Sequence, residues 1–356
     1  MISVLTTPGK YFQCKNALAY LPKYTNYMGD TFAIICDKFV MKMLRELLIS
    51  VFDNNITLEF FEFNGESTWK EANQLVEQIQ KKSCEVVIGL GGGKTIDTAK
   101  LVSDLCDLPL VIIPTVASSD APCSSISVVY NEDGSFKEAI KLDRNPDIVL
   151  VDTEIILNAP VRTLIAGIGD AFSTYYEARA CRQSGALNFS GGVATEAGFE
   201  LTRLCRDILF EYAEQAKHAV ENRYWCEELE KVVEANIYLS GVGFENNGCA
   251  IAHAVYNGLT AIISPFPALH GEAVAYGTYV QLLMEGTSNE EMAKITDFYH
   301  ATGMPTSLKE LGISDVNLDL LEQIAIAICN TKHVKNMPFE VKMDQVKLVL
   351  QQLEGI

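Results

Sequence analysis

The chain contains 356 residues, of which 48% are apolar and 21% charged, a composition typical of a globular enzyme with two domains. Its formal net charge of −18 argues against nucleic acid or an anionic membrane as a partner, because phosphate-rich surfaces would repel it. No apolar run reaches the roughly 18–20 residues that span a bilayer, and the N-terminal stretch lacks the pattern of a secretory signal. We therefore expect a cytoplasmic protein that binds a small molecule. Its ten cysteines form no C-x-x-C pair, so reduced thiols are expected rather than disulfides or a cysteine zinc site.

Strand and helix patterns alternate through the first 160 residues. An Asp133-Gly134 pair marks a β-hairpin over residues 125–140. The order predicts an α/β domain with a parallel sheet and helices on both faces. The predicted strands cover 31–37, 56–63, 84–90, 109–115 and 147–152, and the predicted helices cover 38–52, 67–82 and 95–105.

Beyond about residue 160 the strand-like runs nearly vanish and long helical patterns replace them. The sequence therefore predicts two domains that meet near Pro160, an α/β domain over 1–160 and an all-α domain over 161–356. The clearest helical patterns cover 169–183, 194–222, 225–246 and 271–287.

The segment VVIGLGGGKTIDTAK, residues 86–100, joins a strand to a helix through a run of glycines. A triphosphate-binding P-loop requires G-x-x-x-x-G-K-[ST], but Gly89 stands one residue too close to Gly93-Lys94-Thr95. The Rossmann pattern G-x-G-x-x-G also fails, because Lys94 occupies the third glycine position. Bare backbone N–H groups at a helix start still favour phosphate binding. The alternative is a plain turn, although three consecutive glycines exceed what a turn requires.

Three ionisable residues lie in apolar helical surroundings, where an unpartnered imidazole or carboxylate is costly. A divalent cation would satisfy all three, because two imidazoles and one carboxylate with an open fourth position form a catalytic zinc set. The alternative interpretation is a set of hydrogen-bonded core residues. The three residues are Asp170, His253 and His270. Of the other histidines, His218 lies on a charged helix, where we expect it to be exposed to solvent, and His300 and His333 belong to no motif.

Several segments, in order, resemble the glycerol dehydrogenase family, the zinc-dependent branch of the iron-containing alcohol dehydrogenases. Together they are more specific than the glycine loop alone. The resemblance implies a dehydroquinate synthase-like fold in which the dinucleotide-binding α/β domain over 1–160 holds NAD and the helical domain over 161–356 holds the metal and the substrate. NAD would lie in the cleft between the two domains. The matching segments are GLGGGKTIDTAK (89–100), IPTVASSDAPCSSISVVY (113–130), VDTEIILNAP (151–160), GIGDAFSTYYEAR (167–179), AIAHAVYNG (250–258) and HGEAVAYGTYVQL (270–282).

The resemblance implies which residues contact the cofactor. Asp37 matches an acid that binds the adenosine ribose, where a carboxylate accepts hydrogen bonds from the hydroxyls and repels a 2′-phosphate. Its alternative role is a helix cap. The other positions that match cofactor contacts are Gly91, Gly92, Gly93, Lys94, Thr115, Ser118, Ser124, Ile126 and Tyr130.

The resemblance also assigns the metal and substrate residues. Iron-type members carry two further histidines where this chain has Thr174 and Asn257, and this difference favours zinc over iron. Asp120 matches an acid that contacts glycerol and would bind a second hydroxyl; its alternative role is a turn acid. The family's catalytic zinc ligands correspond to Asp170, His253 and His270.

The predicted activity is the NAD-dependent oxidation of a small polyol, glycerol or a 1,2-diol, to the hydroxyketone by zinc-assisted hydride transfer. The nearest alternative is a hydroxycarboxylate or other alcohol dehydrogenase on the same scaffold. A dehydroquinate synthase-like lyase would need basic residues for a phosphorylated substrate, and few lie near the three ligands. The loop spacing disfavours phosphoryl transfer, and a non-catalytic binding protein would not need the buried trio. Family members assemble, so a homo-oligomer, from dimer to octamer, is expected.

Overall fold

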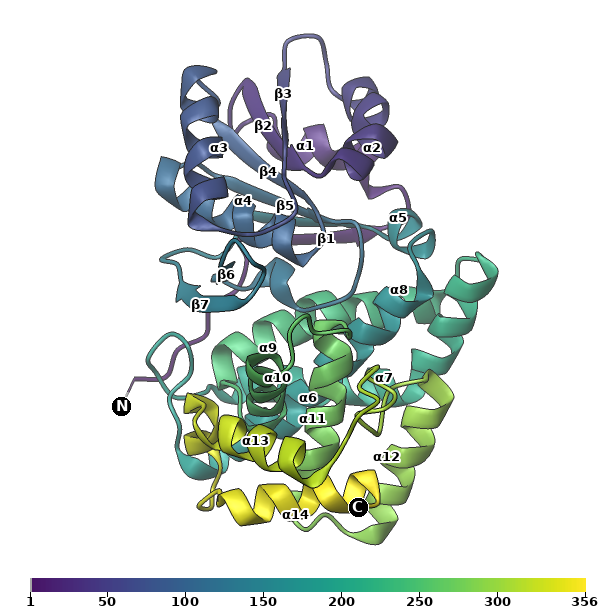
Figure 1. The fold of residues 1–356 in the computed structure, drawn as a ribbon. Helices are drawn as coiled ribbons and strands as arrows, with labels where there is room; N and C mark the ends of the chain where they lie inside the picture. Colours follow the sequence, from purple (N-terminus) through teal and green to yellow (C-terminus); the bar gives the residue numbers. More distant parts are fainter. Residues whose placement is uncertain (1) are drawn as a thin grey trace.

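The computed structural model describes residues 2–356, with an α/β part above a helical part in Figure 1. Its main sheet is parallel throughout, as predicted. The outer strand β1 was not predicted, because its residues are only partly buried and lack an apolar run. The strand order is β1 (Lys10–Cys14), β8 (Ile148–Asp152), β5 (Leu110–Pro114), β4 (Val86–Gly91), β2 (Thr31–Cys36) and β3 (Thr57–Glu62).

Helices cover both faces of this sheet, which confirms the predicted α/β layering. Successive residues of a strand point to opposite faces, so Phe32 packs with α1 and α2, whereas its neighbour Ala33 packs with α3 and α4. The helices are α1 (Leu21–Thr25), which follows a 3₁₀ turn η1 (Ala17–Tyr20), α2 (Lys38–Val51), α3 (Trp69–Lys81) and α4 (Gly93–Cys106).

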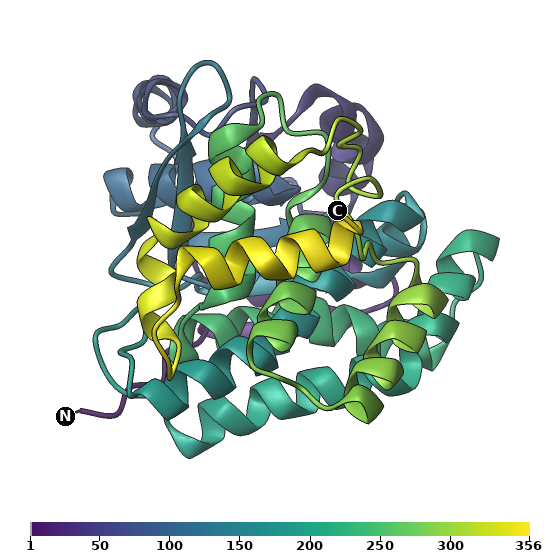
Figure 2. The ribbon, with the colours of Figure 1, turned by 60° about the horizontal axis from the view of Figure 1, so that its bottom comes forward.

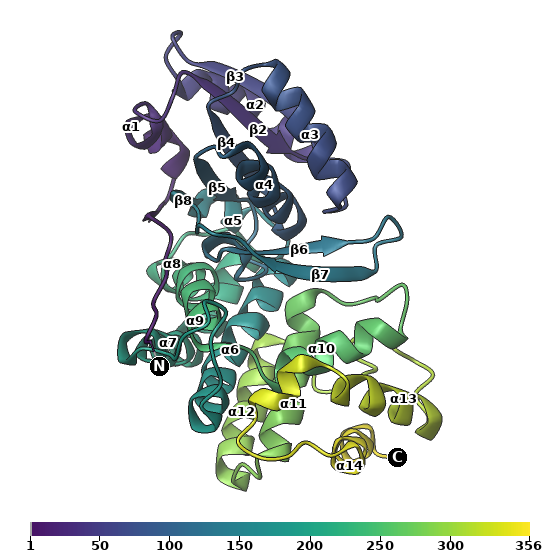
Figure 3. The same ribbon diagram turned by 90° about the vertical axis from the view of Figure 1, so that its left-hand side faces the viewer.

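The predicted β-hairpin is present as β6 (Ile126–Tyr130) and β7 (Phe136–Lys141), an antiparallel pair. Figure 3 shows it between the sheet and the helical part. The backbone N–H of Tyr130 donates to the carbonyl oxygen of Ser67 at 2.8 Å, which ties the hairpin to the segment before α3. A short 3₁₀ turn, η2 (Ala121–Cys123), lies between β5 and the hairpin.

The second part of the chain is built around α6, which packs against α7, α9 and α11. The predicted helix over 225–246 is interrupted by one turn of π-helix, η3 (Ala235–Leu239). The early helices are α5 (Thr153–Leu157), α6 (Val161–Ser184), α7 (Glu196–Asn222), α8 (Glu227–Glu234) and α9 (Ser240–Asn247). The later ones are α10 (Ile251–Ile262), α11 (His270–Met284), α12 (Asn289–Thr302), α13 (Leu318–Cys329), the 3₁₀ helix η4 (Lys332–Asn336) and α14 (Met343–Glu354).

A second apolar core joins α10 and α11 to α13 and α14. Figure 2 shows these two C-terminal helices, in yellow, on the side away from the sheet. All ten cysteines are free thiols, as expected. Within residues 2–356, no helix combines the length and apolarity that a membrane span requires. The division into domains over 1–160 and 161–356 stays a prediction, although α6 begins at Val161.

Candidate metal centre and cofactor loops

Two glycines let α6 and α11 cross in close contact. A Cβ at Gly169 would lie 2.5 Å from the carbonyl oxygen of Gly271, and a Cβ at Gly271 would lie 1.8 Å from that of Ala166. A larger residue at either position would force the helices apart. Asp170 follows the first glycine and His270 precedes the second, so this crossing brings their side chains together.

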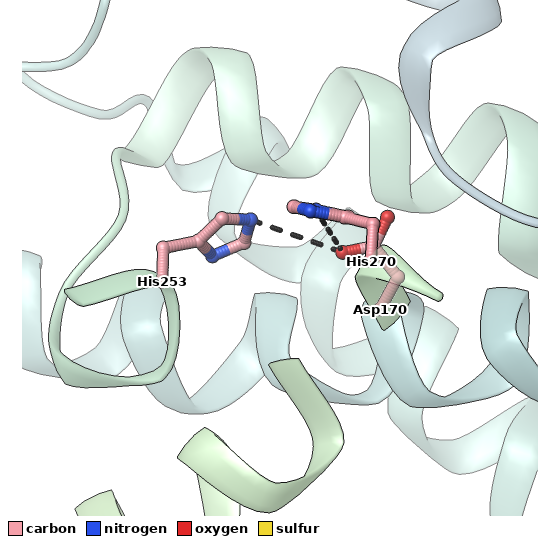
Figure 4. A group of neighbouring side chains, drawn as sticks. All are labelled: Asp170, His253 and His270. Atoms are coloured by element: carbon pink, nitrogen blue, oxygen red, sulfur yellow. Dashed lines mark ion pairs between the residues drawn. The ribbon is translucent and has the colours of Figure 1, made fainter. Parts of the chain in front are cut away.

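Figure 4 shows the two imidazoles converging on one carboxylate oxygen. The Nε2 of His270 lies 3.3 Å from Oδ1 of Asp170, and the Nε2 of His253 lies 3.8 Å from the same atom. This Oδ1 is buried and has no hydrogen-bond partner among residues 2–356. A buried oxygen without a partner, facing two imidazole nitrogens, fits a divalent cation that all three atoms would coordinate.

The three side chains differ in their access to solvent. Asp170 is fully buried, whereas the side chains of His253 and His270 are 15% and 34% exposed. The candidate ligand atoms lie within 4.8 Å of one another. The candidate set thus combines one buried carboxylate with two imidazoles that solvent can reach. Three protein ligands with one open position are characteristic of catalytic rather than structural zinc.

Behind His253 lies Glu177, a carboxylate that the sequence analysis missed. Its Oε2 is 2.7 Å from Nδ1 of His253, and its Oε1 accepts hydrogen bonds from the backbone N–H groups of Ala250 and His253 at 2.7 and 3.0 Å. Glu177 stands seven residues after Asp170, two turns along the same face of α6. The desolvation argument applied to Asp170 therefore extends to Glu177. Glu177, Cys249 and His253 form a second group within metal-binding distance.

The side chains of the site affect one another's pKa values. Burial alone would raise the pKa of the Asp170 carboxyl, but the adjacent His270 and His253 rings outweigh it and hold that pKa below its usual value. Burial, followed by the charge of Asp170, raises the pKa of the Asp120 carboxyl well above its usual value. Two buried carboxylates side by side favour a bound cation or a shared proton.

Asp120 is held beside Asp170 by two hydrogen bonds. Its backbone N–H donates to Oδ2 of Asp170 at 3.2 Å, and the hydroxyl of Ser240 donates to Oδ2 of Asp120 at 3.0 Å. The Ser240 hydroxyl also lies 2.8 Å from the hydroxyl of Thr174. Thr174 occupies the position where the resemblance places a histidine in iron-type members. Asp120 is thus a buried residue built into the site, and the turn that contains it explains only part of its environment.

The π-helical turn η3 shapes this contact. Asn236, within the turn, donates from Nδ2 to the carbonyl oxygens of Ala117 and Leu164 at 3.1 and 3.3 Å. Ser240 follows directly after the turn. A π-helical turn inserts an extra residue and shifts the side chains beyond it around the helix axis. The hydrogen bond from Asn236 to Ala117 attaches the π-helical turn to the loop that leads to Asp120. Ser240 then lies beside the Asp120 carboxylate.

The predicted cofactor loops lie at the carboxyl ends of three adjacent parallel strands, β2, β4 and β5. Ligands of open α/β sheets bind at this edge. Gly92 caps α4 without a side-chain hydrogen bond, which leaves backbone donors at the helix start. A Cβ at Gly92 or Gly93 would make only ordinary van der Waals contacts, at 3.5 and 3.6 Å, whereas one at Gly91 would meet the side chain of Thr95 at 2.8 Å. Packing therefore accounts for Gly91, and the next two glycines are partly exposed.

Four further predicted cofactor residues lie near the start of α4 and the hairpin. Thr115 and Ser118 lie in the loop beside the start of α4, where the N–H of Thr115 donates to the carbonyl oxygen of Gly91 at 3.0 Å. Lys94 contacts Glu66, and its Nζ lies 5.0 Å from the centre of the Tyr130 ring.

Ser124 and Ile126 are buried, and their contact with the cofactor stays a prediction. The buried Lys100 donates from Nζ to the carbonyl oxygens of Ala121 and Ile126, both at 2.6 Å, and lies 3.4 Å from the Ser124 hydroxyl. Lys100 was not predicted. Its two hydrogen bonds hold the segment 121–126, which follows β5.

Asp37 caps α2 by accepting a hydrogen bond from the backbone N–H of Val40 at 2.9 Å. This is the alternative role considered for it, and the ribose contact stays a prediction. Tyr256 is a further residue that the sequence analysis missed: its ring packs edge-on against His270, with the centroids 4.3 Å apart. Of the other histidines, His218 and His300 are exposed, as expected for His218.

Comparison with known proteins places the chain among relatives of the same length and fold. The family model for iron-containing alcohol dehydrogenase matches residues 8–153. A glycerol dehydrogenase from Citrobacter freundii is 41% identical over 348 residues, covering 97% of this chain and 95% of the relative. The crystal structure of glycerol dehydrogenase from Schizosaccharomyces pombe has a TM-score of 0.95 at 36% identity, covering 99% of this chain and 91% of that one.

A probable glycerol dehydrogenase from Sinorhizobium meliloti 1021 has a TM-score of 0.93 at 36% identity, with 99% of each chain covered. Identity at this level over nearly the full length of both chains extends the family assignment beyond the segment that the family model matches. The chain therefore belongs to the iron-containing alcohol dehydrogenase family.

Proposed function

We propose that the chain oxidises glycerol or another small 1,2-diol to the hydroxyketone with NAD as the hydride acceptor. The proposal rests mainly on the buried, unpartnered Oδ1 of Asp170, toward which the Nε2 atoms of His253 and His270 point. The full-length similarity to glycerol dehydrogenases supports the same activity. These three residues would hold a divalent metal, which we propose to be zinc because two imidazoles and one carboxylate suit it.

A bound zinc ion would supply Lewis acidity, which lowers the pKa of a hydroxyl placed against it. The chain's own residues would orient the substrate. Solvent reaches the site past His253 and His270, which are partly exposed, and Asp120 is buried beside Asp170 with one carboxylate oxygen held by Ser240. The other oxygen of Asp120 is free to accept a hydrogen bond from a second hydroxyl. Such a contact would favour vicinal diols over simple alcohols.

For the cofactor, we propose that the N-terminus of α4 binds the NAD pyrophosphate. Backbone N–H groups at Gly92 and Gly93 and the helix dipole favour an anion there. Lys94 would add a positive charge, and Asp37 would bind the adenosine ribose. The residues proposed for the rest of NAD are Thr115, Ser118, Ser124, Ile126 and Tyr130.

The proposal includes a homo-oligomeric, cytoplasmic enzyme in which the domains over 1–160 and 161–356 enclose the cofactor. The net charge of −18 supports the absence of a nucleic-acid partner.

The test combines metal analysis with a substrate screen. Purified protein should contain about one zinc per chain and reduce NAD with glycerol and 1,2-propanediol faster than with 1-propanol or 2-hydroxyacids. Alanine at Asp170, His253 or His270 should abolish turnover in a folded protein, whereas His218→Ala, at an exposed histidine, should leave it unchanged. Full activity in metal-free His253→Ala protein, or a preference for 2-hydroxyacids, would overturn the proposal.

A further inference from the structure

Glu177 is a fully buried carboxylate without a role in the proposed reaction. We propose that Glu177 is a positioning residue, which fixes the orientation and tautomer of the His253 ring so that Nε2 is presented to the metal. The inference rests on the proposed function, because it assumes that the metal lies between Asp170, His253 and His270. It adds a residue that acts on the site through a ligand.

The tautomer follows from the hydrogen bond. An ionised carboxylate only accepts hydrogen bonds, so the 2.7 Å contact with Oε2 of Glu177 requires the proton on Nδ1 of His253. In a neutral ring, Nε2 then carries the lone pair that a metal needs. This Nε2 is the atom directed at Asp170 Oδ1, so the two ring nitrogens have separate functions. A carboxylate behind a metal-binding histidine commonly increases its basicity and fixes its rotation.

The second oxygen of Glu177 fixes the backbone that carries the ring. Oε1 accepts from the N–H groups of Ala250 and His253, at the start of α10, where four backbone donors lack partners within the helix. Glu177 belongs to α6, the helix that also carries Asp170. One side chain thus locks the start of α10 and the His253 ring to the helix of a second ligand. Metal affinity depends on this alignment. A cation binds more tightly when the ligand side chains are already in place, because binding then does not have to order them.

The alternative is that Glu177 ligates a metal directly with Cys249 and His253, which lie within reach of one another. Such a cation would displace the 2.7 Å hydrogen bond at Nδ1 and compete with the two backbone donors for Oε1. It would also leave Asp170 Oδ1 without a partner. The observed contacts of the glutamate therefore favour positioning over ligation.

The test uses Glu177→Gln in the full-length protein. If the glutamine carbonyl accepts from the backbone, its NH₂ group faces Nδ1 and favours the tautomer with the proton on Nε2, which cannot bind metal. If the amide is reversed, its NH₂ group faces two backbone donors. Either orientation should weaken zinc binding by about 10–100-fold. The readouts are the zinc dissociation constant from chelator competition and the melting temperature of the metal-free protein.

The matched control is Glu245→Gln. Glu245 is also fully buried and accepts hydrogen bonds from Ser125 and Asn145, without contacting His253. Its replacement should leave the zinc dissociation constant unchanged. Zinc binding by Glu177→Gln as tight as in the wild type would overturn the inference. If Asp170→Asn also leaves zinc binding unchanged, the proposed metal site itself is wrong, so the two failures are distinguishable.

A measurement on the wild type covers the case in which Glu177→Gln does not fold. In the zinc-loaded, ¹⁵N-histidine-labelled protein, NMR should show His253 with a protonated Nδ1 and a metal-shifted Nε2. The ring can be assigned by comparison with His253→Ala, since the chain has five histidines. A metal on Nδ1, or a proton on Nε2, would contradict the inference directly.

Discussion

Gly271 and Ala166 pack so closely that a Cβ added to Gly271 would lie 1.8 Å from the Ala166 carbonyl oxygen. That oxygen belongs to the backbone of α6 and cannot rotate away. The helices would have to separate, and His270 would move away from Asp170. The glycine therefore determines the geometry of the candidate metal site without contacting a metal.

We expect Gly271→Ala to weaken zinc binding by at least about tenfold and to lower the free energy of unfolding by about 1–3 kcal/mol. Chelator competition and denaturant unfolding measure the two effects. The control is Gly9→Ala, just before β1 in the α/β part of the chain, where a Cβ would lie 2.8 Å from the carbonyl oxygen of Asp147, away from the ligands. It should destabilise the protein without changing metal affinity. Equal zinc affinities in the Gly271→Ala and wild-type proteins would contradict this role.

The hydrogen bond from Ser240 should contribute to diol recognition by holding one oxygen of Asp120. Removing one hydrogen bond to a charged group changes binding by about 1.5 kcal/mol, or roughly tenfold. Ser240→Ala should therefore lower kcat/KM for glycerol by roughly tenfold and leave that for 1-propanol nearly unchanged. Thr278→Ala removes a buried hydroxyl that donates to Val274 within its own helix and serves as the control. A parallel loss on both alcohols would indicate a general structural role.

Asp37 should determine the choice between NAD and NADP. Its carboxylate would repel the 2′-phosphate of NADP. Asp37→Gly should shift the ratio of kcat/KM values for NAD and NADP toward NADP by about tenfold, while loss of the cap on α2 destabilises the protein by about 1 kcal/mol. Asp37→Asn retains a capping oxygen and removes the charge, so it separates the two effects. An unchanged ratio in both variants would exclude Asp37 from the ribose site.

His333, in the turn η4, should make stability depend on pH. Burial, followed by the charge of His253, lowers its pKa from the usual 6.5 to about 4. As the pH falls below about 6.5, the unfolded chain binds a proton that the folded protein does not, so stability decreases until about pH 4. The loss should reach about 2–3 kcal/mol in the metal-free protein.

Urea unfolding of metal-free protein at several pH values measures this contribution. His333→Gln should remove most of the decrease between pH 6.5 and 4, whereas His300→Gln, at an exposed position on α12, should not. A wild-type stability that does not change over this range would contradict the expectation.

The sheet could be predicted because its central strands are continuous apolar runs that end in glycine, proline or acid. β1 could not, because its partly exposed residues owe their strand conformation to pairing with β8. The π-helical turn η3 was missed for a related reason. Its residues read as ordinary helix, and the extra residue is specified by contacts with the loop before Asp120.

The candidate ligands could be found because carboxylates and imidazoles in apolar helices demand partners. Glu177 satisfied the same criterion and lies in the matching segment 167–179, but the resemblance assigned it no role. Lys100 was hidden for the opposite reason, since a lysine at a helix surface is usually solvated. Its burial depends on the carbonyl groups of a turn about 20 residues later, which only the folded chain brings near. The roles of Glu177 and Lys100 therefore depend on contacts between residues that are distant in the sequence.

Asp120 contacts Asp170 through its own main chain, by a backbone N–H at 3.2 Å. Any amino acid other than proline can retain that attachment, provided that its side chain fits the buried space that Asp120 occupies. Small side chains at position 120 can therefore be exchanged without detaching the loop from the carboxylate beside it. A scaffold of this kind can acquire new substrate preferences by single replacements at one position, and libraries of small residues there should yield folded, metal-competent proteins.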